Sequence, residues 1–192
     1  RRLCDAQALA APFGIFLVRC ANFANAELYG RVAPASLPWA IRFPTDPIAR
    51  ALAPDLATGG SLRWHDAYAR LRAAGQWDAI APHVPLRHPS QLYEALLEGV
   101  VVGALLWTLY ARRSTVAVRH GGIAATFLLG YALARFLVEF TRQPDAQLGF
   151  VLGPFSMGQV LSLGVAVGAA GIVFWPRAVT EKSAQTNVSR VL

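Results

Sequence analysis

Three long apolar stretches dominate the pattern of hydrophobic and polar positions along the chain. They cover residues 92–110, 121–140 and 155–175. As a helix, each is long enough to cross a bilayer core of about 30 Å. An additional apolar stretch, residues 6–26, precedes these three, so in chain order it is the first of four and 155–175 is the last. It contains Pro12 and Gly14 and is expected to form a kinked or interior helix. The pattern predicts an all-α fold, a polytopic transmembrane helix bundle that forms a single membrane domain over residues 1–192.

The composition supports a membrane protein and argues against a nucleic-acid-binding domain. Of the 192 residues, 55% are hydrophobic and 15% are charged, and the mean hydropathy is +0.39. The net charge of +7 could suit nucleic acid, an anionic membrane surface or an anionic substrate. Because so apolar a chain is untypical of a nucleic-acid binder, we expect membrane lipid as a partner and no nucleic acid.

Basic residues between and after the apolar stretches predict the orientation in the membrane. Three of them lie between the second and third spans and two follow the last span: Arg112, Arg113, Arg119, Arg177 and Lys182. By the positive-inside rule, these loops and the C-terminus are cytoplasmic. The segment 32–87 is then external and is expected to form a loop, an arm or a small cap. Prolines exclude long helices from its first half, whereas residues 61–77 fit a short amphipathic helix.

Polar and ionisable residues stand directly behind the first apolar stretch, where charge is costly and often functional. Arg19 and Asn22 are three residues apart and share a helix face, and Glu27 lies about two turns beyond Arg19. On one continuous helix, the guanidinium, amide and carboxylate would line a single polar groove. Such a groove suits an anionic ligand that is rich in oxygen.

A second polar set lies inside the third apolar stretch. Tyr131, Arg135 and Glu139 are spaced by four residues, so a helix stacks them on one face. One interpretation is an internal ion pair between Arg135 and Glu139 that fixes helix packing. In the other, Arg19 and Arg135 on neighbouring helices bring together more positive charge than Glu139 neutralises, and bind the phosphate diester of a phospholipid.

Further polar residues mark the starts of two spans. His88, Gln91 and Glu94 precede or open the second span and are expected to support the site. Glu94 and Glu98, again four residues apart, either line the interior cavity or are solvated or hydrogen-bonded at the interface. Residues 156–159 open the last span with small and amide side chains, which favour close helix packing.

Four blocks of the chain together resemble the bacterial prolipoprotein diacylglyceryl transferases. They are RCANFANAELYGR (19–31), HPSQLYEA (88–95), RFLVEFTRQPDAQLG (135–149) and SMGQVLS (156–162). The resemblance implies an inner-membrane enzyme without metal or soluble cofactor. It would transfer the diacylglyceryl group of phosphatidylglycerol to the lipobox cysteine thiol in a prolipoprotein signal peptide. By position, it implies substrate-binding residues Arg19, Asn22, Gly30 and Arg135, and catalytic residues Arg19, Glu27, Tyr131, Arg135 and Glu139.

The resemblance is incomplete at two places. The family has an upstream His-Gly-Gly segment whose histidine is implicated in deprotonating the thiol, and this chain has no counterpart. We therefore expect an N-terminally incomplete fragment that is inactive alone. In addition, Val18, Ala21 and Ala26 stand at positions that are glycine, or often glycine, in the family signature. These departures leave a second interpretation open, a non-catalytic phospholipid-binding membrane protein.

Overall fold

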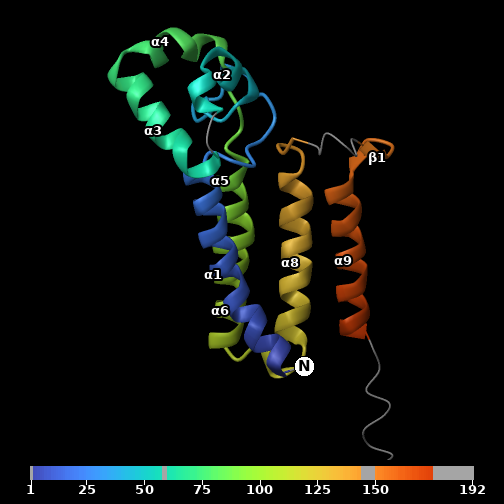
Figure 1. The fold of residues 1–192 in the computed structure, drawn as a ribbon. Coiled ribbons are helices and arrows are strands. Elements are labelled where there is room, and N and C mark those ends of the chain that lie inside the picture. The colour runs from blue at the N-terminus through green and yellow to red at the C-terminus, as the bar shows by residue number, and fades with distance from the viewer. Residues whose placement is uncertain (1, 58–59, 144–149, 175–192) are drawn as a thin grey trace, which may run out of the picture.

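A computed structural model describes residues 2–57, 60–143 and 150–174 (Figure 1). Four long helical stretches run side by side and carry a cap of short helices at one end. The long stretches are α1 (Arg2–Ala24), the continuous run of α5 (Ser90–Glu94), η3 (Ala95–Val101) and α6 (Val102–Ala111), then α8 (Gly122–Val138) and α9 (Met157–Phe174). Within the second stretch, η3 is a π-helical segment. A short helix, α7 (Thr115–Val118), lies between α6 and α8.

Helices occupy the four stretches that the apolar pattern predicted. Two of them, Arg2–Ala24 and Ser90–Ala111, are long and apolar enough to cross a membrane, and α8 and α9 contain shorter apolar helices. That all four cross a membrane as one bundle stays a prediction. Arg177 and Lys182, used above for orientation, lie outside the described residues.

The described residues are mostly helical, as the all-α prediction requires, and a short two-stranded hairpin before α9 is a local exception. The antiparallel strands are β1 (Phe150–Leu152) and β2 (Phe155–Ser156). Between them, Gly153 has a φ of +56°, a left-handed conformation that glycine adopts without steric cost. Because residues 155 and 156 pair with β1, the last helix begins at Met157 rather than at 155.

Contacts at the far end from the cap set the register of α1 against α8. The buried core between these helices and α6 contains Ala8, Val102, Leu106 and Ile123. The Asp5 carboxylate on α1 accepts hydrogen bonds from the backbone N–H groups of Gly121, at 2.7 Å, and Ala124, at 2.9 Å. These amides begin α8 and have no partner within their own helix, so the carboxylate satisfies them and complements the helix dipole. The contact aligns the two helices that carry Arg19 and Arg135.

The segment 32–87 forms a small helical cap with a core of its own. Its helices are α2 (Pro47–Leu52), η1 (Pro54–Leu56), α3 (Gly60–Ala73), α4 (Gln76–Ile80) and η2 (Ala81–His83). The single helix predicted over 61–77 is wrong at its end, because Gly75 has a φ of +69° and separates α3 from α4. The turn folds α4 back, and the buried core collects Ala49, Ala53, Leu56, Ala67, Leu71, Trp77 and Val84.

Short backbone pairings and a buried ion pair close the base of the cap, and a hydrogen bond from Arg87 joins the cap to the segment that follows α8. The pairings are Gly30 with Arg142, Val32 with Arg87, and Ile41 with Arg87. Arg87 Nε lies 2.6 Å from the fully buried Asp46 carboxylate, and its Nη1 donates to Gln143 Oε1 at 2.8 Å. The ion pair thus fixes Arg87 inside the cap, and the hydrogen bond to Gln143 connects this arginine to the segment that follows α8.

Candidate anion-binding site

Three arginine side chains from separate parts of the chain surround one buried carboxylate. Glu94 Oε2 lies 2.7 Å from Arg19 Nε. Glu94 Oε1 lies 3.0 Å from Arg135 Nη1 and 2.9 Å from Arg142 Nη1. The Glu94 side chain is 0% exposed, whereas those of the arginines are 16–19% exposed. The carboxylate is therefore enclosed, and part of each guanidinium remains within reach of a ligand.

Two further carboxylates extend this arginine cluster. Buried Glu98, one turn after Glu94, lies 3.6 Å from Arg19 Nη2. Glu139 lies 2.9 Å from Arg135 Nη2 and accepts a hydrogen bond of 2.9 Å from the Ser156 hydroxyl. The ion pair between Arg135 and Glu139 is thus confirmed. The predicted excess of positive charge is wrong. Glu94 and Glu98 join Glu139, so the cluster contains three carboxylates and three arginines.

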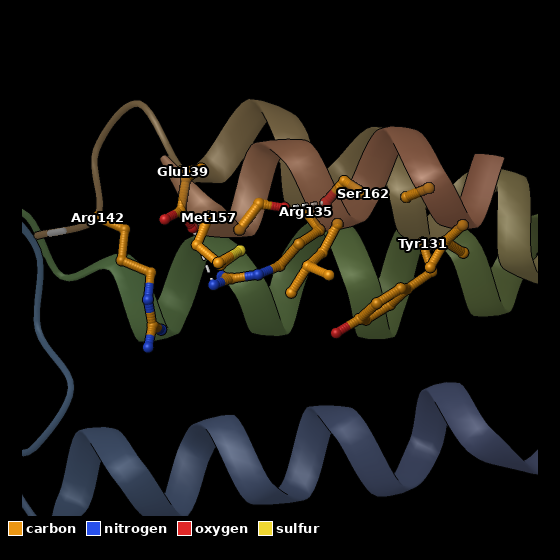
Figure 2. A pocket seen from close by; sticks show the side chains of 10 residues that line it. Tyr131, Arg135, Glu139, Arg142, Met157 and Ser162 are labelled. Carbon is orange, nitrogen blue, oxygen red and sulfur yellow. Dashed lines mark hydrogen bonds and ion pairs between the residues drawn. The ribbon is translucent and has the colours of Figure 1, made fainter. Parts of the chain in front are cut away.

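A cavity of about 260 Å³ opens between α8 and α9 beside the cluster. Its walls are Tyr131, Ala132, Arg135, Glu139, Arg142, Met157, Gly158, Leu161, Ser162 and Val165. Figure 2 shows Arg135, Arg142 and Tyr131 extending toward the same side, with Met157 and Ser162 contributed by the neighbouring helix. Charged groups at one end and apolar side chains along α9 suit an amphiphilic anion. Among the described residues, no three His, Cys, Asp or Glu side chains are grouped to hold a metal ion.

Glu27 lies outside this cluster, so the predicted groove of Arg19, Asn22 and Glu27 on one helix face is wrong. Helix α1 ends at Ala24, and Ala26 and Leu28 both have positive φ, 52° and 58°. The chain therefore reverses around Glu27 and leaves it exposed, with its carboxylate 3.4 Å from the Asn25 amide.

Asn22 and Gly30 occupy supporting positions next to the cluster. Asn22 is half-buried one turn after Arg19, and its backbone carbonyl accepts a hydrogen bond from the Glu27 N–H at 3.0 Å. Gly30 pairs through its backbone with His88 and with Arg142. A Cβ atom at Gly30 would overlap the Thr141 carbonyl oxygen, so only glycine lets these two segments approach.

The block that begins at His88 fastens the end of α1 to the start of the second span. Gln91 is fully buried and donates to the Glu27 carbonyl at 2.6 Å, and Ser90 donates to the Leu28 carbonyl at 3.2 Å. His88 is half-buried, with Nδ1 3.4 Å from the Tyr93 hydroxyl. Three residues were predicted to support the site, and the structure brings only Glu94 into the arginine cluster. Gln91 lies about one helical turn before Glu94, and His88 lies just before the helix begins.

The departures from the family signature differ in their consequences. Val18 is 57% exposed and Ala21 is also exposed, so within the described residues neither crowds a neighbour. Ala26 is buried with a φ of 52°, a conformation that costs a non-glycine residue energy. Only the Ala26 substitution therefore carries local strain.

Three members of the cluster were not assigned site roles from the sequence. Arg142 lies just past the end of α8, three residues after Glu139. That spacing is the sequence signal that could have placed Arg142 near the other charged residues. For Glu98, the spacing from Glu94 had left two alternatives open, a place in the interior cavity or solvation and hydrogen bonding at the interface. Ser156 was assigned to close packing, and its hydrogen bond to Glu139 depends on the hairpin before α9. The end of the third block, residues 144–149, lies outside the described residues.

Comparison with known proteins adds evidence of a different kind. A family model described as prolipoprotein diacylglyceryl transferase matches residues 1–175. Three relatives carry the name phosphatidylglycerol–prolipoprotein diacylglyceryl transferase. The relative from Rhodospirillum centenum is 44% identical over 83% of this chain and 44% of its own length. The relative from Paraburkholderia phymatum is 41% identical over 89% of this chain and 52% of its own length. The relative from Gluconacetobacter diazotrophicus is 38% identical over 88% of this chain and 47% of its own length. The chain spans about half the length of these curated relatives.

Proposed function

Because the chain belongs to the prolipoprotein diacylglyceryl transferase family, we propose that the protein acts as that transferase. It moves the diacylglyceryl group of phosphatidylglycerol onto the lipobox cysteine of a prolipoprotein. The observation that carries this proposal is the convergence of three partly accessible arginines beside a cavity with an apolar wall. Such a site binds a phosphate whose lipid chains lie along the helices.

The proposed reaction needs fixed positive charge at the phosphate. The cysteine sulfur bonds to the C3 carbon of the diacylglyceryl group, and the bond from C3 to the phosphate oxygen breaks with its electrons left on oxygen. The thiol proton is released and glycerol phosphate departs. Arg135 and Arg142 line the cavity and would hold the phosphate, while Arg19 is anchored behind them on Glu94. Preorganised cations of this kind stabilise the charge that grows on the leaving group.

Other residues would shape the cavity around these arginines. Tyr131 and Glu139 line the same wall as Arg135, and Glu139 orients Arg135 through the ion pair of 2.9 Å. Asn22 and Gly30 would complete the headgroup site from the end of α1. Ser156 holds Glu139 from the far side. Glu27 has no place at this cluster and would act at the edge of the cap.

We place the long helices in the bacterial inner membrane, with the cap outside and the C-terminus in the cytoplasm. Helix α8 has 17 residues, so it covers about 26 Å at 1.5 Å per residue. With the flanking turns, this length suits a hydrocarbon core of about 30 Å. The arginines that follow α6 are at the opposite end from the cap, as the positive-inside rule requires.

A second candidate is a phospholipid-binding protein without catalysis. The observation that favours it is the pairing of every arginine in the cluster with a carboxylate, which a purely structural network would also show. The two candidates differ in whether a carbon–sulfur bond forms.

The proposal is tested with the intact protein in vesicles that contain phosphatidylglycerol and a lipobox peptide. We expect a peptide product whose mass has increased by the diacylglyceryl group, together with released glycerol phosphate. A peptide with serine in place of the cysteine is the control and gains no mass. Lipid binding without peptide modification would contradict the transferase and favour the second candidate.

Replacing Gly158 by alanine is expected to lower kcat/KM about tenfold, because overpacking at such a contact costs about 1–3 kcal/mol. A Cβ atom there would lie 2.8 Å from the Glu139 carboxyl carbon and would push this side chain away from Arg135 and Ser156. Gly164→Ala on the same helix is the matched control, because its Cβ meets nothing within 4 Å. Equal transfer rates for the two variants would show that the position of Glu139 is unimportant.

A further inference from the structure

A second cavity, of about 220 Å³, lies where the end of α1 meets the cap. We call it the outer cavity. The residues on its wall that matter here are Asn25, Glu27, Tyr29, Arg50 and Trp64. Trp64 belongs to α3 and Arg50 to α2, so the cap builds one side of the outer cavity against the segment that follows α1.

Trp64 offers a hydrogen-bond donor that the described part of the chain does not use. The residue is 6% exposed and packs in a cluster with Ala26 and Phe43. Its indole Nε1 is buried and has no acceptor among the described residues. Buried donors are nearly always paired, and because Trp64 lines the outer cavity, a ligand in that cavity is a candidate acceptor for this N–H.

The other polar groups of the outer cavity provide both donors and acceptors. The Glu27 side chain is exposed and lies on the wall of the outer cavity, between Ala26 and Leu28, whose positive φ values mark a strained backbone. Arg50 is also exposed. Burial and the Asp46 carboxylate raise the pKa of Tyr29 above its usual value, and its hydroxyl donates to the Thr45 carbonyl at 3.4 Å, so Trp64 and Arg50 are the donors that can serve a ligand. The donors can bind carbonyl oxygens and the carboxylate can accept from an N–H group. These are the hydrogen-bonding groups of a polypeptide main chain.

The distance from the arginine cluster favours a peptide over a lipid headgroup. Asn25 continues the helical pattern of α1, donating to the Ala21 carbonyl at 2.8 Å. Six residues separate Arg19 from Asn25, which is about 9 Å along a helix axis. An extended peptide covers that distance in about three residues at roughly 3.3 Å each. A glycerol phosphate headgroup has five bonds of about 1.5 Å from its phosphorus to its terminal hydroxyl and reaches about 6 Å when extended, so it stops short of that distance.

We propose that the outer cavity binds the main chain of the acceptor polypeptide about three residues after the reacting cysteine. Trp64 donates to a carbonyl of that segment, Glu27 accepts from an N–H group, and Arg50 binds a further carbonyl or an acidic side chain. This inference rests on the proposed function, because it assumes a cysteine peptide at the arginine cluster. It gives α3 of the cap a role in substrate recognition.

The test compares two lipobox peptides with the intact protein in phosphatidylglycerol vesicles. One peptide ends one residue after the cysteine, and the other continues for six more. We expect a lower KM for the longer peptide. Trp64→Phe removes the indole N–H and is expected to raise KM for the longer peptide about fivefold, the effect of one hydrogen bond, while KM for the shorter peptide stays constant. Arg50→Gln, at an exposed position, is expected to act in the same direction without disturbing the cap.

Two control variants separate recognition from cap stability. Trp77→Phe alters a tryptophan in the cap core, and Arg70→Gln alters an exposed arginine of α3; neither residue lines the outer cavity. Unchanged KM for the longer peptide in both Trp64→Phe and Arg50→Gln would overturn the inference. A raised KM for phosphatidylglycerol instead of the peptide would overturn it in favour of a lipid headgroup. No product from the unmodified protein would refute the proposed function itself, and with it this inference.

Discussion

Arg135→Ala in the intact protein is expected to lower kcat/KM for thioether formation about 10²- to 10³-fold, the cost of removing one preorganised group that stabilises transition-state charge. Arg135 is the arginine that both lines the cavity and contacts two carboxylates, Glu94 at 3.0 Å and Glu139 at 2.9 Å. Its guanidinium is therefore held in place before substrate arrives. The measurement is the initial rate of peptide modification over a range of phosphatidylglycerol concentrations.

Arg135→Lys distinguishes charge from geometry at the same position. Lysine keeps the positive charge, which preserves the balance of the cluster, but cannot form the forked contact to two phosphate oxygens. We expect it to recover part of the lost activity and to reach membranes at the normal level. Arg112→Ala, an exposed arginine directly after α6, is the control and should leave transfer unchanged. Full activity of Arg135→Ala would exclude the proposed phosphate site and favour lipid binding elsewhere.

Local sequence signals were sufficient for the long helices and for one wall of the site. The apolar runs are long and continuous, so each had to bury or insert its surface as a helix. Within α8, the spacing of Tyr131, Arg135 and Glu139 placed them on one face because helical geometry decides that locally. The same reasoning failed for Glu27, since the two left-handed residues around it end the helix and neither is glycine.

The centre of the cluster could not be predicted because it depends on packing between distant segments. Glu94 contacts Arg19, Arg135 and Arg142 only after the second span has packed against both α1 and α8. Before folding, nothing in the block that begins at His88 distinguishes a buried glutamate from one at the interface. The cap shows the same limit, since its core forms only when Gly75 turns α4 back against α3.

Glu94→Gln is expected to lower the free energy of unfolding by about 3 kcal/mol, the usual cost of removing one partner from a buried ionic network. The amide keeps the shape of the side chain but removes the negative charge shared by three arginines. Glu98 and Glu139 then face three guanidinium groups, and the cluster carries an excess positive charge. The measurement is denaturant unfolding of the intact protein in detergent micelles, with Asp66→Asn, at an exposed position of α3, as the control.

Adding Arg142→Gln to Glu94→Gln restores equal numbers of arginines and carboxylates in the cluster. If charge balance is what stabilises it, the double variant should be more stable than Glu94→Gln alone. The coupling between the two positions should then be about 0.5–3 kcal/mol, as for residues in one ionic network. Arg142 is the suitable partner because it lies past the end of α8, where its loss leaves the helix intact. Strictly additive destabilisation by the two substitutions would show that Glu94 acts through its own hydrogen bonds rather than through the balance of charge.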